Sequence, residues 1–395
     1  MVIYNIENVT DTMVLGESVF SPNGDLLVAA GYQLKERYRL RLKQLGFTSV
    51  YIEQNGTEDI LPETVINSHV QREMSASINK STDGIKNVLE VKQQGSLIVQ
   101  RAIRDNQNEL NKYIMNSGLS LALEKFIEEI MNQNAVMVNM AAMQGANADL
   151  LAHVINVTIT ALCIGKKYKF SYDEMKQLGI GALNYDLGLV ALPSELLDKV
   201  GQLTEEEIRT YRQHTVYGYL MLSQSPLIPA TSSAVALQHH EHQDGSGFPR
   251  SLNGQNDTPL KDLGRKNVIH RFAEIVAVAD TYDLLTSGRL GLNRHPLAPA
   301  AAIRTMIEMG GSRLNNHIVK TLVAIIPLFP VGARVRITKS LVPQLAGLTG
   351  AVAKQDPGNL ERPLIICYET RNGEPIKPVK IDLGQHPEMV IELIT

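Results

Sequence analysis

Histidine and acidic side chains that could act as metal ligands are concentrated in the middle of this 395-residue sequence. His239 and His240 are adjacent, and the run Asp244–Pro249 that follows them contains two glycines and a proline. The chain must therefore turn directly after the pair. Neutral imidazole binds iron, manganese and zinc. The pair predicts either a metal site at the end of a helix or a histidine cluster on the surface before a loop.

Two aspartates follow or interrupt apolar helical patterns. Asp186 comes at the end of an apolar helix predicted to begin near Glu174, where its carboxylate either bridges two hard cations or caps the helix end. Asp280 lies inside the Ala/Val/Ile-rich helix predicted over Arg271–Leu285. A buried carboxylate is unfavourable unless it is paired or bound to a metal ion. Asp280 is therefore a stronger candidate ligand than an aspartate on the surface.

Further candidate ligands lie upstream on helical patterns. Asp149 and His153 are four residues apart and therefore share one helix face, as two metal ligands do and as ordinary helix contacts also do. Thr204 precedes three consecutive glutamates, which predicts a capped helix start. His214 lies further along the same segment.

The elements that must position these residues are mainly helical. Apolar residues recur at helical spacing over residues 131–329, whereas polar and apolar residues alternate from residue 330 onward, as is typical of strands. A hairpin signal at residues 21–25 precedes a helical pattern at Tyr32–Leu45. We expect a mainly α, multidomain chain with four parts: a small α/β unit at 1–60, a helical connector at 61–130, an all-helical metal-binding domain at 131–329, and a small, barrel-like β domain at 330–395.

Composition narrows the classes of partner and location. A formal net charge of -3 gives no general electrostatic reason to bind nucleic acid or an anionic membrane. We expect no stretch to reach the roughly 18 apolar residues that span a bilayer. The two cysteines are far apart and are expected to be reduced thiols of a cytoplasmic protein. The helical connector is either a linking segment or a dimerisation segment, so a homodimer is one of the two options.

The motifs together resemble the HD-GYP family of phosphodiesterases. The run His239–Pro249 is similar to the family signature, with Phe248 where a tyrosine is usual, and Val276–Ser287 is similar to the helix that follows the signature. The other candidates occur upstream in family order: His153, then Tyr185-Asp186 in place of the usual His-Asp, then His214.

The resemblance implies an all-helical bundle with two, or as many as three, divalent transition-metal ions, usually iron or manganese. It also implies hydrolysis of cyclic di-GMP or a related cyclic dinucleotide in bacterial signalling, with signalling proteins as further partners. Asp186 is the expected catalytic residue, because it would bridge the metal ions and help to hold the attacking water. Carried over position by position, the metal ligands are His153, Asp186, His214, His239, His240 and Asp280, with Asp149 and Tyr185 as additional candidates. The substrate contacts carried over are Asp283, Arg289 and, as an additional candidate, Arg294.

Two departures from the family pattern bear on activity. Tyr185 puts a phenol where an imidazole is expected, and a group with a pKa of about 10 is a poor ligand for Mn(II) or Fe(II). Leu189 replaces the lysine that the family places three residues after its aspartate, and leucine cannot stabilise developing charge on a phosphate. Two functions therefore stay open: a cyclic-dinucleotide phosphodiesterase with weakened activity, or a catalytically inactive metal- or nucleotide-binding sensor or scaffold.

Overall fold

A computed structural model describes residues 1–21, 25–45, 47, 49–61, 65–89, 95–133, 150–199, 201–260, 267–287, 296–356 and 358–394. The chain divides into two compact units. The first unit joins residues 1–65 to residues 324–395 and includes the short stretch 135–152. The second unit comprises residues 66–134 and 153–323. Both units are therefore built from segments that are distant in the sequence.

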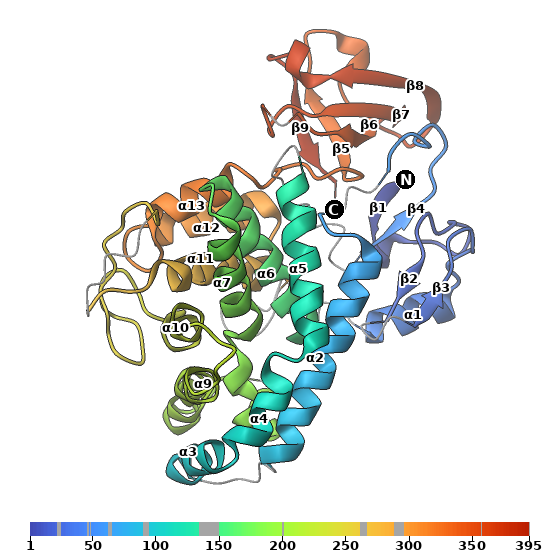
Figure 1. Ribbon diagram of the computed structural model, residues 1–395. Coiled ribbons are helices and arrows are strands. Elements are labelled where there is room, and N and C mark those ends of the chain that lie inside the picture. The colour runs from blue at the N-terminus through green and yellow to red at the C-terminus, as the bar shows by residue number, and fades with distance from the viewer. Residues whose placement is uncertain are drawn as a thin grey trace. The chain divides into compact units, whose positions relative to one another are not determined.

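The regular elements described in the second unit are helices (Figure 1). Its first four are α2 (Ser68–Leu89), α3 (Ser96–Asp105), α4 (Gln107–Ile114) and α5 (Ser117–Asn132). α2 packs on α4 and α5. α5 lies mostly within the helical connector predicted at residues 61–130, and its buried face includes Leu123, Phe126 and Ile127. Asn116 caps this helix by accepting the backbone N–H of Leu119 at 3.0 Å.

The next helices carry most of the candidate ligands. They are α6 (Leu150–Lys167), α7 (Tyr172–Asn184), the 3₁₀ helix η3 (Leu187–Ala191), the short α8 (Ser194–Leu197), α9 (Glu205–Ser223) and α10 (Ala230–Gln238). Thr204 and Glu207 form a capping box at the start of α9, so the predicted helix start is confirmed. Ser171 and Glu174 form the same motif at the start of α7. α10 packs on both α7 and α9.

Three more helices complete the second unit: α11 (Arg271–Ser287), α12 (Pro299–Met309) and α13 (Asn316–Val323). α11 contacts α7, α10, α12 and α13, and twelve of its residues are buried. The prediction that this helix is buried on most sides is therefore confirmed. Its central position explains why the carboxylates of Asp280 and Asp283 lie inside the protein.

α6 corrects one expectation from the sequence. Among the described residues it is a helix that is long and apolar enough to cross a membrane, so the expectation that no stretch reaches this length was wrong. In the folded chain 78% of this helix is buried inside the protein. Packing in the helical core therefore accounts for its apolar composition equally well.

The C-terminal part of the first unit is a small antiparallel sheet with the strand order β8-β7-β6-β5-β9. Its strands are β5 (Arg334–Lys339), β6 (Thr349–Lys354), β7 (Leu364–Glu369), β8 (Pro375–Asp382) and β9 (Val390–Leu393). A β domain was predicted here, and the sheet confirms it. The barrel-like closure was wrong for the described strands. Closure would require β8 and β9 to pair with each other, whereas these two strands form the open edges of the sheet.

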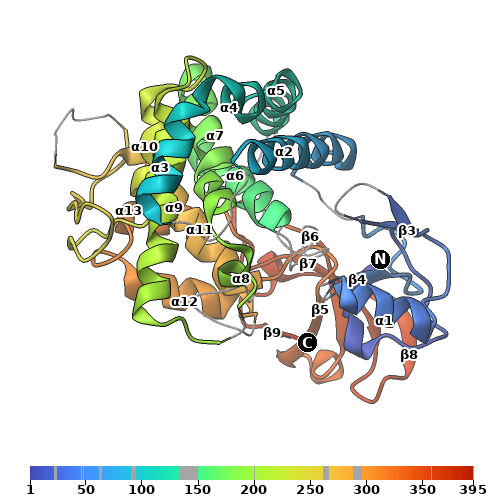
Figure 2. The ribbon, with the colours of Figure 1, turned by 90° about the horizontal axis from the view of Figure 1, so that it is seen from below.

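The described residues of the N-terminal part of the first unit form two strand pairs, the 3₁₀ helix η1 (Ile6–Asn8) and the α-helix α1 (Glu36–Gln44). β1 (Val2–Asn5) pairs with β4 (Ser49–Ile52), and β2 (Val19–Phe20) pairs with β3 (Leu26–Val28). Both pairs are antiparallel. The helix α1 falls within the pattern predicted at residues 32–45. Figure 2 shows α1 in blue near the label of the N-terminus.

The two terminal segments share one hydrophobic core within the first unit. The backbone N–H of Ile3 donates to the carbonyl oxygen of Gly332 at 2.7 Å, and the Arg334 guanidinium lies 4.5 Å from the ring centroid of Tyr4. Gly332 has a φ of 84°, and a side chain at this position would approach the Tyr51 ring, so the close contact needs glycine. The four-part division predicted from the sequence stays a prediction, but its first and last parts have a common core.

Candidate metal centre

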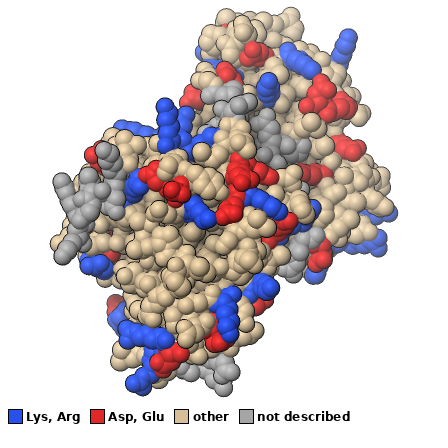
Figure 3. All heavy atoms as spheres, in the orientation of Figure 1, with Lys and Arg blue, Asp and Glu red and all other residues tan. Residues whose placement is uncertain are grey.

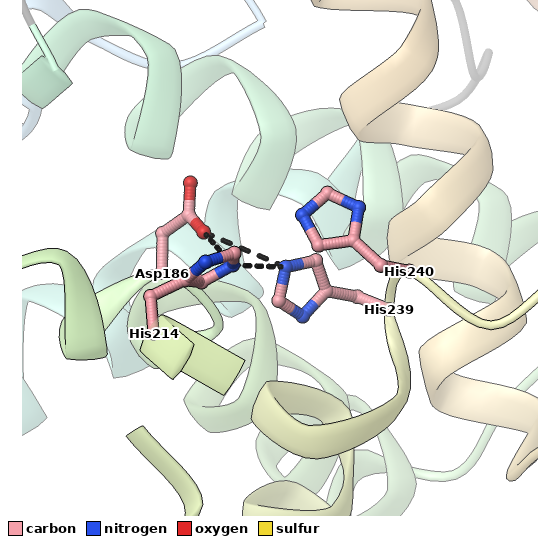
Figure 4. A group of neighbouring side chains, drawn as sticks. All are labelled: Asp186, His214, His239 and His240. Carbon is pink, nitrogen blue, oxygen red and sulfur yellow. Dashed lines mark hydrogen bonds and ion pairs between the residues drawn. The ribbon is translucent and has the colours of Figure 1, made fainter. Parts of the chain in front are cut away.

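Four side chains of the second unit converge at one point (Figure 4). Asp186 follows α7 and precedes η3, His214 lies in α9, and His239 and His240 follow directly after α10. Their potential ligand atoms all lie within 4.8 Å of one another. The structure thus brings together four of the six residues that the family resemblance gives as ligands.

Local structure directs these side chains toward the cluster. The alternative interpretation of Asp186 was a cap at the end of the preceding helix, but the C-cap residue of α7 is Tyr185. The side chain of Asp186 also makes no capping hydrogen bond at the start of η3. The carbonyl oxygen of His240 accepts the backbone N–H of Phe248 at 3.1 Å. This bond closes the turn that the glycine-rich run predicted.

Glu241 stabilises the loop that follows this turn. Its buried carboxylate accepts the backbone N–H groups of Arg250 at 2.7 Å and Leu252 at 2.8 Å. A charged acceptor that receives two backbone donors makes strong hydrogen bonds. Glu241 therefore has a structural role in holding the loop after the histidine pair, which the sequence pattern did not reveal.

The spacing within the cluster is that of ligands around a cation. Nε2 of His214 lies 3.4 Å from Nε2 of His239, and Oδ1 of Asp186 lies 3.4 Å and 3.5 Å from these two nitrogens. Ligands in tetrahedral positions about 2.1 Å from a metal ion are separated from one another by about 3.4 Å. These three atoms are therefore already spaced to hold one ion.

Hydrogen bonds determine which imidazole nitrogens face the cluster. Nδ1 of His214 donates to the carbonyl oxygen of Tyr211 at 2.6 Å, and Nδ1 of His239 lies 3.1 Å from the carbonyl oxygens of Val235 and Ala236. Because a carbonyl oxygen only accepts, each Nδ1 carries a proton, and in a neutral imidazole the Nε2 lone pair then faces the cluster. Histidines that bind metal ions usually donate their second nitrogen in this way.

The carboxylate of Asp186 gives independent evidence that the cluster suits a cation. Its Oδ1 is buried and has no hydrogen-bond partner among the described residues. It faces two nitrogen lone pairs, so three acceptors converge without a donor between them. Buried acceptors are unfavourable unless a donor or a positive charge satisfies them. The donor set of three imidazoles and one carboxylate therefore fits a divalent transition metal.

The ionisation of these groups suits metal binding. Burial opposes ionisation of Asp186, but the adjacent histidines outweigh it and hold the pKa of Asp186 well below its usual range. Burial lowers the pKa of His214 and of His240, and neighbouring imidazoles lower both pKa values further. An ionised carboxylate beside neutral imidazoles is the protonation state that ligands need.

Phe248 and Arg212 border the cluster. The ring of Phe248 stacks on His240 with 4.7 Å between ring centroids. The guanidinium of Arg212, an exposed residue of α9, lies 4.8 Å from the centroid of the Phe248 ring. Sequence reasoning missed Arg212, because no motif distinguishes it from the other charged residues of α9.

The other predicted ligands form a hydrogen-bonded network that begins one residue before Asp186. The Tyr185 hydroxyl lies 2.6 Å from Nε2 of His153 and donates to Oδ1 of Asp280 at 2.9 Å. Nε2 of His153 also lies 3.0 Å from that aspartate oxygen. On its other side, Nδ1 of His153 lies 2.7 Å from Oδ2 of Asp283. Asn156, a residue that the sequence did not single out, donates to Oδ1 of Asp283 at 2.8 Å.

This network holds His153 in place on both sides. Burial lowers the pKa of His153, but the hydrogen bonds to Asp280 and Asp283 outweigh it and raise the pKa to about 9. Both carboxylate oxygens of Asp283 bond to protein groups, and the residue is buried. The structure thus places Asp283 behind the imidazole, whereas the family resemblance gives it a contact with substrate.

Several sequence predictions fall outside the described residues. They concern Asp149 as a ligand, and Arg289 and Arg294 as substrate contacts. Leu189, which replaces the expected lysine, is a buried residue of η3. Position 189 therefore offers an apolar side chain where the family has a lysine ammonium group.

Comparison with known proteins shows which family of domains this helical unit resembles. Residues 125–318 match the family described as the HD domain. This segment matches the HD domain, and its motif residues resemble those of the HD-GYP type, with Tyr-Asp in place of His-Asp.

Three relatives show what this segment is similar to. A cyclic di-GMP phosphodiesterase of Pseudomonas aeruginosa is 29% identical over 59% of this chain and 51% of its own length. The cyclic di-GMP phosphodiesterase response regulator RpfG of Xanthomonas campestris is 30% identical over 51% of this chain and 48% of its own. The 3′3′-cGAMP-specific phosphodiesterase 2 of Vibrio cholerae is 28% identical over 46% and 33%. The chain spans about half the length of the first two relatives.

Proposed function

We propose that the second unit is a metal-dependent phosphohydrolase domain that hydrolyses or senses a cyclic dinucleotide, with weak phosphodiesterase activity. The observation that carries this proposal is the convergence of two Nε2 lone pairs on the unpartnered, buried Oδ1 of Asp186. The relatives named for activity on cyclic di-GMP or cGAMP support the substrate class.

The proposed chemistry divides between the metal ion and the chain. A bound divalent ion, iron or manganese for this nitrogen and oxygen donor set, would lower the pKa of a water and neutralise charge on the phosphoryl oxygens. His214, His239 and His240 would hold the ion, and Asp186 would both ligate it and accept a hydrogen bond from the attacking water. The exposed guanidinium of Arg212 suits a phosphodiester oxygen near the same cluster.

Weak activity follows from two positions next to the cluster. Leu189 is buried and apolar, so this position offers no cation to the phosphate. Tyr185 directs its hydroxyl to His153 and Asp280. The same two positions support the alternative proposal, in which the domain binds metal and nucleotide as a sensor or scaffold without turnover.

Location and partners belong to the proposal as well. Both cysteines are free and buried, which supports a reduced, cytoplasmic protein. Charged side chains of both signs are interspersed on the face shown in Figure 3, which supports partners other than nucleic acid. Leu97 and Ile98 of α3 are exposed, and exposed apolar residues support association with a second copy or with a signalling protein.

A paired measurement tests the proposal. The purified protein is loaded with Mn(II) and incubated separately with cyclic di-GMP and with 3′3′-cGAMP, and both linear products and nucleotide binding are measured. We expect bound metal, binding of at least one nucleotide, and turnover well below the roughly 1–10 s⁻¹ of an ordinary enzyme. Binding without any turnover favours the sensor. A protein that binds neither metal nor nucleotide contradicts both functions.

A further inference from the structure

We infer that this domain holds a single metal ion, at Asp186, His214, His239 and His240. A metal-free hydrogen-bonded network built around Tyr185 fills the second metal position that the HD-GYP resemblance implies. The inference rests on the proposed metal centre and specifies its stoichiometry. Its basis is a contrast between two adjoining groups of buried side chains.

The first contrast is in the distances between potential ligand atoms. In the cluster, the nitrogen and oxygen atoms of Asp186, His214 and His239 are 3.4 to 3.5 Å apart, which leaves room for an ion between them. In the network, the Tyr185 hydroxyl lies 2.6 Å from Nε2 of His153 and 2.9 Å from Oδ1 of Asp280. These are hydrogen-bond distances. The shorter one is also below the roughly 2.8–3.0 Å that separates adjacent octahedral ligands at 2.0–2.1 Å bonds.

The second contrast is in how the polar atoms are satisfied. Oδ1 of Asp186 in the cluster has no hydrogen-bond partner among the described residues. In the network, each nitrogen of His153 lies within 3.0 Å of an oxygen atom, and Oδ1 of Asp280 accepts the Tyr185 hydroxyl. An ion entering this network would have to break hydrogen bonds of 2.6 to 2.9 Å that the protein already makes, whereas an ion in the cluster would meet the unpartnered Oδ1 of Asp186.

The position of the phenol ring explains how the two groups are kept apart. Tyr185 is fully buried. Its ring lies edge-on to His239 of the cluster, with 4.9 Å between centroids, and edge-on to His153 of the network at 6.1 Å. The ring therefore occupies volume between the two imidazoles. A histidine at this position is smaller and could direct a nitrogen to an ion, which the phenol does not do here.

Metal counting with a spectroscopic readout tests the inference in the full-length chain. The apo protein is loaded with Mn(II), loosely bound ions are removed, and manganese per chain is measured by elemental analysis and electron paramagnetic resonance. We expect one ion per chain with the six-line signal of an isolated Mn(II). Tyr185→His should bind two ions and give the broadened signal of an exchange-coupled pair. His153→Gln should retain one ion, and His214→Ala, the matched control in the cluster, should lose it.

The outcomes separate this inference from the proposed function. Two ions per wild-type chain, or loss of the ion in His153→Gln when circular dichroism shows a folded protein, overturns the inference and leaves the metal centre standing. A Tyr185→His protein that still binds one ion also counts against it. No ion in the wild-type chain overturns the inference and the proposed metal centre together. Because the wild-type count needs no substitution, the test stays decisive if a variant fails to fold.

Discussion

Asp186 supplies the one carboxylate of the four-residue cluster, and its oxygen faces two imidazole nitrogens. Asp186→Asn keeps the shape of the side chain but replaces a charged ligand with a neutral amide. We expect the affinity for Mn(II) to fall by at least about tenfold, since even changes around metal ligands cost that much. Equilibrium dialysis measures the effect. Asp173→Asn, at an exposed position of α7, serves as the control and should bind metal normally.

Arg212 offers a positive charge beside the aromatic ring that borders the cluster. Arg212→Ala should weaken binding of a cyclic dinucleotide by about tenfold, the loss expected for one hydrogen bond to a charged group, and should leave manganese content unchanged. Calorimetric titration gives the affinity. Arg209→Ala removes an exposed charge from the same helix and is the matched control. If both variants weaken binding equally, general charge rather than a specific contact is responsible.

Tyr185 and Leu189 are expected to limit hydrolysis jointly. Leu189→Lys alone should add little activity, because the ion that it would assist is absent, and Tyr185→His alone should mainly add metal. The double variant should raise kcat/KM by more than the product of the single effects, since both changes act on the same transition-state charge. Release of linear dinucleotide measures this coupling. Wild-type protein that already turns over at roughly 1–10 s⁻¹ with Mn(II) would refute the premise of a defective centre.

The residues that could ligate a metal ion were predictable from the sequence, but the hydrogen bonds that they make were not. Asp186, His214 and the pair His239-His240 lie in motifs that can be recognised from the local pattern and from the order of motifs in the family. The bond from Tyr185 to Asp280 joins residues that are 95 positions apart, and no local pattern encodes it. Arg212 was missed for a related reason: its place beside the cluster is visible only from its contact with the ring of Phe248, which is distant in the sequence.

At the scale of elements, helix starts were the most predictable feature. A threonine followed by glutamates at Thr204 gave the start of α9 because the capping box is a local motif. The start of α7 uses the same motif, and its Glu174 also bonds to Arg271 of α11 at 2.7 Å. This ion pair joins α7, which directly precedes Tyr185 and Asp186, to α11, which carries Asp280. It depends on tertiary packing and was not foreseen.

α11 carries a further buried acid, Glu274, whose ionisation should affect stability. Burial raises the pKa of Glu274 to about 7, although hydrogen bonds from Gln243 and Asn315 oppose the increase. The folded state therefore binds a proton more tightly than the unfolded state, in which the pKa is near its ordinary value of 4.5. The contribution of this carboxyl to the free energy of unfolding is favourable at low pH and decreases as the pH rises from about 4.5 through 7.

Glu274→Gln tests this linkage. The amide cannot ionise, so the free energy of unfolding should depend less on pH, with a change relative to wild type on the order of 2–3 kcal/mol between pH 5 and pH 8. Urea denaturation of both metal-loaded proteins at several pH values gives the comparison. Glu308→Gln, at an exposed position of α12, should leave the pH dependence unchanged. Parallel curves for wild type and Glu274→Gln would show that this carboxyl does not titrate in that range.

At the scale of the whole molecule, the sequence indicated where the spacing of apolar residues changes, but not which segments fold together. The change from helical to alternating patterns near residue 330 is visible because helices and strands have different periods. The shared core of residues 1–65 and 324–395 is not visible, because apolar residues in two small segments carry no sign of their partner. Each segment alone would read as a small domain of its own.

Deletion of residues 324–395 distinguishes these two views. The four clustered ligands belong to the second unit, so we expect the truncated chain to bind as much Mn(II) as the full chain. The N-terminal segment should lose its packing partners, because Val331, Val335 and Ile337 belong to the same core as Val2 and Ile52, and exposure of that apolar surface is unfavourable. Limited proteolysis should therefore cut residues 1–65 rapidly in the truncated chain and slowly in the full chain. Equal protection in both chains would mean that the N-terminal segment folds independently, and a loss of metal on truncation would show that the second unit does not end where its contacts place it.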